Sequence, residues 1–215
     1  MGRSPVGGGR RQPQRRRQVL RYLLACEGDT EVAYFKYLSK RMGGTVVLRP
    51  VHGYPDPNHV VELAIKERGA DLQAAKAAGD PAETYDGVWA VMDVDTHPHL
   101  SQAVAEAKRS GVAVAISGPC FETWLILHLE NRTAAFSTSK AAKDHWVKLA
   151  GSTRTAQQEF AQLGGKVAAA SERAKVLTAR HDQDAVPRHK RNPSSEIGVL
   201  IETVCARAGL DPKAL

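Results

Sequence analysis

The sequence predicts an α/β protein, in which a four-stranded parallel sheet is flanked by helices and followed by a C-terminal helical extension. Between residues 18 and 131, short apolar runs alternate four times with helical patterns. Such alternation is typical of parallel strands joined by right-handed crossovers. Beyond residue 131 the helical patterns continue alone. The length of 215 residues suits one core domain with additions.

The four expected strands are short runs rich in apolar and β-branched residues. They lie at about 18–25, Thr45–Val51, Asp86–Met92 and Val112–Ile116. A segment with apolar residues at helical spacing follows each of them. The expected helices begin near Thr30, His59, Leu100 and Pro119.

Three parts of the chain are expected to differ in structure. Residues 1–17 are rich in Gly, Pro and Arg and are expected to form a disordered basic arm. Residues 18–131 form the α/β core, and residues 132–215 form a helical extension packed on it. Within the extension, helices are expected at about Ser139–Leu149, Thr155–Arg180 and Ser194–Ala208.

Positive charge is concentrated at the start of the chain. The net charge is +7, and six arginines with no acidic residue lie within the first 17 residues. A basic arm of this kind indicates a nucleic-acid partner. The alternative interpretation is a disordered leader that only improves solubility.

The spacing of the cysteines and the hydropathy pattern indicate the cellular location to be expected for the protein. Cys26, Cys120 and Cys205 are far apart and lack CxxC spacing, so neither a disulfide framework nor a zinc site is expected. A reducing, cytoplasmic environment fits this pattern. No run of about 20 apolar residues is present, so no membrane span is expected.

Acidic residues follow two of the expected strands. Glu27 comes directly after the first strand, and Asp93 and Asp95 come at the end of the third. In open α/β sheets, functional groups gather at the carboxyl ends of strands. Hard divalent cations prefer oxygen ligands, and a bound cation can activate water and neutralise charge on a phosphodiester. The pattern therefore predicts a Mg²⁺ or Mn²⁺ site in which Glu27 acts as a ligand or a general base.

Other residues are candidates for the same site. Glu31 lies one helical turn after Glu27 and is a candidate metal residue, which would bind a second metal ion or support the residues that bind the first. The alternative is an ordinary acid favoured by the helix dipole. Glu122 opens the helix after the fourth strand and is expected to point into the same cleft. His97 is a candidate general acid or hydrogen-bond donor, with exposure on a loop as the alternative. Candidate phosphate contacts, each equally explained as solvated surface charge, are Lys140, Lys143, Lys166, Arg188, Lys190 and Arg191.

Four ordered motifs resemble those of the RloB family of prokaryotic proteins. They are CEGDTE at Cys26–Glu31 with YFKYL at Tyr34–Leu38, MDVD at Met92–Asp95, SGPCFETWLILH at Ser117–His128 and NPSSEIGVLIE at Asn192–Glu202. Gly118 stands where this family usually has Asn. The resemblance runs from about Val19 to Glu202 and leaves the basic arm outside it.

The resemblance implies a Toprim-like fold, related to OLD-family nucleases. It identifies Glu27 with the Toprim glutamate and Asp93 and Asp95 with the DxD pair, and it makes Glu122 an additional acidic site residue. It also implies a link with phage defence and an ATPase partner.

The leading functional hypothesis is a metal-dependent nuclease that cleaves DNA or RNA. The alternative is a non-catalytic module that senses nucleic acid or a nucleotide and regulates a partner ATPase. Nucleotidyl transfer, as in primases, is a third interpretation; no Gly-rich P-loop is present, although primase-like sites do not require one.

Overall fold

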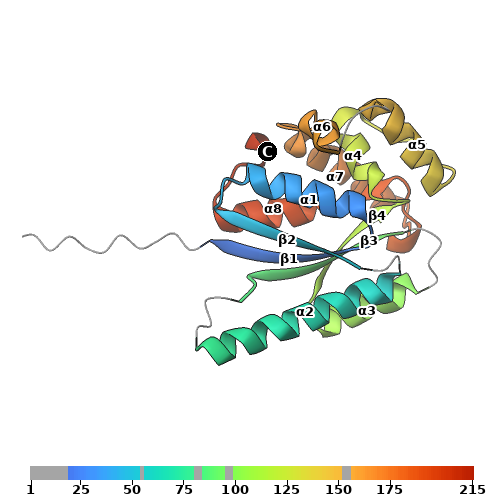
Figure 1. Cartoon of the computed structure of the whole chain (residues 1–215). Helices are drawn as coiled ribbons and strands as arrows, with labels where there is room; N and C mark the ends of the chain where they lie inside the picture. The colour runs from blue at the N-terminus through green and yellow to red at the C-terminus, as the bar shows by residue number, and fades with distance from the viewer. Residues whose placement is uncertain (1–18, 54–55, 80–83, 95–98, 152–155) are drawn as a thin grey trace, which may run out of the picture.

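A mostly parallel sheet lies between helices in the computed structural model, which describes residues 19–53, 56–79, 84–94, 99–151 and 156–215 (Figure 1). The strand order is β2-β1-β3-β4-β5. The first four strands, all parallel, are β1 (Leu20–Cys26), β2 (Val46–His52), β3 (Gly87–Asp93) and β4 (Ala113–Gly118). The α/β class and the four parallel strands predicted from the sequence are confirmed.

The prediction of only four strands was wrong, because the sheet has a fifth strand. β5 (Ser194–Ser195) runs antiparallel to β4 and pairs with Ser117 and Gly118. The sequence analysis placed these residues at the start of a helix. A strand of two residues is too short to show the alternation by which strands are recognised.

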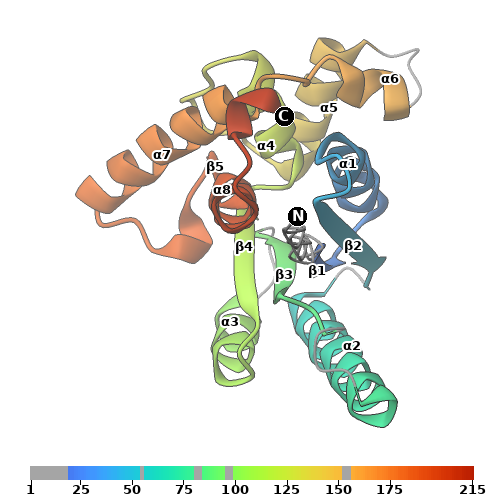
Figure 2. The same cartoon turned by 90° about the vertical axis from the view of Figure 1, so that its left-hand side faces the viewer.

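Helices cover both faces of the sheet. One face carries α1 (Asp29–Arg41), α4 (Glu122–Leu129) and α8 (Ile197–Ala208), and the other carries α2 (Pro57–Ala78) and α3 (Leu100–Arg109) (Figures 1 and 2). Side chains alternate between the two layers, so Leu24 packs on the first side and Leu23 on the second. Burial on both sides explains why the strands are apolar throughout.

The C-terminal helices share a hydrophobic core with the sheet. They include α5 (Ser139–Ala150), α6 (Ala156–Ala161) and α7 (Val167–Gln183), and short 3₁₀ helices lie at η2 (Arg188–Lys190) and η3 (Pro212–Ala214). Trp146 and Leu177 from these helices belong to the same buried cluster as Leu24. The basic arm at residues 1–17 lies outside the described residues.

Two helix predictions in this region were wrong. The single helix expected at Thr155–Arg180 is two helices, α6 and α7, and the break contains Gly165 at φ +74°. Glycine adopts this left-handed conformation at little cost, so the chain can turn there. The helix expected from Ser194 begins only at Ile197, after β5.

The NPS motif holds two loops together. The Asn192 side-chain amide donates to the Phe136 carbonyl at 2.8 Å, and its oxygen accepts from the Phe136 N–H at 3.0 Å. Nearby, a Cβ added to Gly118 would lie 2.0 Å from the Arg191 carbonyl oxygen. Glycine at position 118 is therefore required for the close approach of these two segments.

No described helix is both long enough and apolar enough to span a membrane.

His128 is buried in the helical layer and held as a neutral ring. Its Nδ1 donates to the Trp124 carbonyl at 2.9 Å, so Nε2 is left to accept from the Tyr34 hydroxyl at 3.4 Å. Burial lowers the pKa of His128 to about 4. Only 2% of His128 is exposed, so it is a packed residue of the helical layer.

This burial predicts an acid-dependent loss of stability. Because the unfolded histidine takes up a proton that the folded ring excludes, we expect His128 to reduce the unfolding free energy by roughly 3 kcal/mol between neutral pH and about pH 4. His128→Gln should flatten this part of the pH profile in urea unfolding. His59→Gln, at a side chain that is 57% exposed, is the control. Parallel profiles for the wild type and His128→Gln would contradict the prediction.

Candidate functional site

The junction of β1 and α1 presents the first candidate residue. Glu27 follows the last residue of β1 and is 7% exposed. The chain around it is fixed by the end of β2: the Gly53 N–H donates to the Cys26 carbonyl at 2.7 Å, and His52 Nε2 donates to the Glu27 carbonyl at 3.1 Å. The tight contacts between these strand ends hold Glu27 at the carboxyl edge of the sheet.

Asp93 is the last residue of the neighbouring strand β3. It is partly buried, and its Oδ1 atom is inaccessible and has no hydrogen-bond partner among the described residues. The next residue is anchored to β4, because the Val94 N–H donates to the Ser117 carbonyl at 2.7 Å. A buried carboxylate oxygen without a partner is costly, so this atom needs a functional or structural explanation.

Two helix N-termini bring further carboxylates to the same edge. Glu31, in the first turn of α1, is 5% exposed, and a Cβ added to Gly28 would lie 2.9 Å from its Oε2 atom. Glu122, the first residue of α4, is 8% exposed. We call Glu27, Glu31, Asp93 and Glu122 the carboxylate cluster.

The members of the cluster act on one another electrostatically. Burial raises the pKa of Asp93 well above its usual range, and the charges of Glu31, Glu27 and Glu122 raise it further. Burial also raises the pKa of Glu31 to about 7, and Glu122 adds to this shift. These effects show that the four carboxyl groups share one poorly solvated region.

Two basic side chains interact electrostatically with the cluster. Burial lowers the pKa of Lys143 on α5. The negative charges of Glu122, Asp93 and Glu31 outweigh this effect, so the pKa is raised. His52 Nδ1 lies 3.3 Å from Asp29 Oδ1, and a positive charge on the His52 ring opposes the rise in the pKa of Glu31.

His52 was not among the predicted site residues, whereas Lys143 was one of several candidate phosphate contacts. His52 ends β2 and directly follows the second expected strand, so the strand-end rule could have found it. No local pattern distinguishes Lys143 from the other candidate phosphate contacts.

The remaining predicted site residues are not brought into the cluster by the described structure. Asp95 and His97 lie outside the described residues.

The cluster meets some of the requirements of a metal site. Within the described ranges, no group of three His, Cys, Asp or Glu side chains is already arranged to hold an ion. The donor chemistry nevertheless suits Mg²⁺ or Mn²⁺, which bind through one or two carboxylates together with water. The buried Oδ1 of Asp93, unbonded within the described part of the chain, fits such a ligand role.

The fold and the site define a class of protein: a mostly parallel α/β protein with carboxylates gathered at the carboxyl edge of its sheet. The family model described as RloB-like protein matches residues 22–204. The chain therefore belongs to the RloB-like family, as its motifs predicted. Searches of curated proteins and of solved structures gave no match.

The electrostatics predict that the cluster destabilises the metal-free protein at neutral and alkaline pH. The pKa of Glu31 is about 7 in the folded protein, against 4.5 for a freely solvated glutamate, so its ionisation costs stability as the pH rises between these values. We expect Glu31→Gln to remove a penalty of roughly 3 kcal/mol at pH 8. Chemical unfolding in chelator measures this difference.

The exposed Glu62 on α2 provides the matched control. Glu62→Gln makes the same chemical change away from the cluster, so it should leave the pH profile unchanged. A Glu31→Gln protein that is no more stable than Glu62→Gln at pH 8 would contradict the electrostatic account.

Proposed function

We propose that this protein is a metal-dependent nuclease of Toprim type, acting on DNA or RNA. The observation that carries the proposal is Asp93 Oδ1, a buried carboxylate oxygen that has no hydrogen-bond partner among the described residues and is surrounded by further carboxylates. A divalent cation compensates such a concentration of negative charge. Toprim-likeness is supported by the order of the acidic residues, with Glu27 after β1 and Asp93 ending the adjacent parallel strand β3.

In this proposal Glu27, Asp93 and Asp95 hold Mg²⁺ or Mn²⁺, and Glu31 is an additional ligand. The cation would supply an activated water and stabilise the charge that develops on the phosphodiester. Glu122 completes the acidic wall of the site.

The protein's own side chains have two further tasks in phosphodiester cleavage. Lys143 Nζ binds a non-bridging phosphate oxygen, because it is the cation drawn to this cluster. His97, which follows β3 in the sequence, is proposed to donate a hydrogen bond to the leaving oxygen.

The basic arm and the lysines of the helical extension are proposed to bind the nucleic-acid backbone. Phage defence with an ATPase partner is the setting that the motifs of the RloB family imply.

The first test is cleavage of single- and double-stranded DNA and RNA with Mg²⁺ or Mn²⁺ by the full chain. We expect cleavage that chelator abolishes. Glu27→Gln and Asp93→Asn should each lower the rate at least about 100-fold, a loss of about 2.7 kcal/mol in transition-state stabilisation. Glu62→Gln should cleave like the wild type. Unchanged cleavage in both site variants would refute the assignment.

The second test is the pH dependence of Mn²⁺ binding, measured by calorimetry. A metal ion must displace the protons that Glu31 and Asp93 retain because of their raised pKa values. Below pH 7, affinity should therefore rise by about tenfold per pH unit for each proton displaced. Repeating the titration in buffers of different ionisation enthalpy gives the number of protons released when Mn²⁺ binds. Binding that is independent of pH and releases no proton would contradict the proposal.

A non-catalytic nucleic-acid or nucleotide sensor that regulates an ATPase is the second candidate. It is favoured by the lack of a preformed three-residue metal group among the described residues. Such a module should bind nucleic acid in a salt-dependent manner that survives Asp93→Asn, and it should show no turnover with either metal.

A further inference from the structure

A groove lies between α7 and α8, and none of the four residues of the carboxylate cluster lines it. The groove has a volume of about 520 Å³, within the range of small-molecule sites. Small or apolar side chains form most of its walls, including Ala174 and Ala179 on α7, Val199 on α8 and Trp89 on β3. Ser171 lies in the same wall, and its buried hydroxyl has no hydrogen-bond partner among the described residues.

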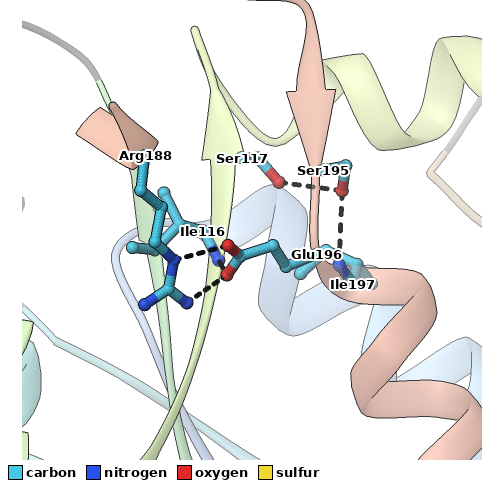
Figure 3. A network of polar contacts seen from close by, with 6 residues as sticks. All are labelled: Ile116, Ser117, Arg188, Ser195, Glu196 and Ile197. Atoms are coloured by element: carbon cyan, nitrogen blue, oxygen red, sulfur yellow. Dashed lines mark hydrogen bonds and ion pairs between the residues drawn. The ribbon is translucent and has the colours of Figure 1, made fainter. Parts of the chain in front are cut away.

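The open edge of β4 borders this groove. β5 pairs only with Ser117 and Gly118 of β4. The preceding residue of β4, Ile116, is hydrogen-bonded to Glu196, which follows β5. The Ile116 N–H donates to Glu196 Oε2 at 3.0 Å, and the Glu196 N–H donates to the Ile116 carbonyl at 2.9 Å (Figure 3). Arg188 holds the same carboxylate through two hydrogen bonds. Glu196 therefore ends the pairing of this edge.

Two residues before Ile116 in β4, the backbone of Val114 faces the groove. The hydrogen-bonding direction alternates along a strand, and Ile116 bonds outward, so Val114 two residues earlier also directs its N–H and C=O outward. Val114 lines the groove, and no described strand pairs with β4 at this position. The groove thus offers one backbone donor beside one backbone acceptor.

The charged residues around the groove are already paired within the protein. Lys175 contacts Glu172 at 2.8 Å and Glu202 at 3.0 Å. Arg188 pairs with Glu196, and Asp182 pairs with Arg191. These side chains therefore need no opposite charge from a ligand, and the apolar walls favour a ligand that is neutral.

We propose that this groove binds a nucleobase. A nucleobase is flat and uncharged, and it carries an adjacent hydrogen-bond donor and acceptor on one edge. That edge complements the Val114 N–H and C=O, while the ring faces pack against the apolar side chains of α7 and α8. The base can belong to a free nucleoside or to a nucleic-acid strand, because the recognised chemistry is the same.

The test is calorimetric titration of the full chain with adenosine, guanosine, cytidine and uridine, and with four-nucleotide single strands of each base. Ala179→Trp fills the groove from an exposed position on α7. Val176→Trp is the matched control, since Val176 is 61% exposed on the same helix and does not line the groove.

We expect saturable 1:1 binding of at least one nucleoside or strand, weakened at least about tenfold by Ala179→Trp and unchanged by Val176→Trp. Binding of a nucleoside identifies a free ligand, and binding of the strand alone identifies a base within a nucleic acid. The proposal is overturned if none of the eight probes binds at about 1 mM, or if the two tryptophan variants bind alike.

Discussion

Electrostatic repulsion among buried carboxylates at the carboxyl edge of the sheet is the interaction on which the proposed site depends. Glu27, Glu31 and Glu122 are each less than one-tenth exposed, and Asp93 has a buried oxygen that makes no hydrogen bond with the described residues. Poor solvation and like charges raise the pKa values of Asp93 and Glu31. Strongly shifted pKa values of this kind are typical of functional sites.

The rest of the fold holds these groups in place. Helical layers on both faces of the sheet fix the strand ends, and each acidic strand end is bonded to its neighbour. The Cys26 carbonyl accepts from Gly53 after β2, and Val94 donates to Ser117 of β4. Glu27 and Asp93 therefore cannot separate without breaking the sheet.

The sequence predicted those features that depend on periodicity and on strand ends. The parallel strands, their helices, and the positions of Glu27 and Asp93 follow from apolar runs that end in acids. Features created by contacts between distant segments were missed. Lys143 approaches the cluster only because α5 packs against α4, which begins at Glu122, and β5 exists only because Ser194 and Ser195 meet β4. The break between α6 and α7 at Gly165 was overlooked because the apolar spacing continues on both sides.

Anomalous diffraction from crystals soaked in Mn²⁺ tests the central claim most directly. The account predicts a peak at coordination distance, about 2.2 Å, from carboxylate oxygens of both Glu27 and Asp93. Asp93→Asn crystals treated in the same way should lose the peak. A wild-type crystal with no peak at these side chains, while Mn²⁺ binds elsewhere, would contradict a metal site at the carboxyl edge of the sheet.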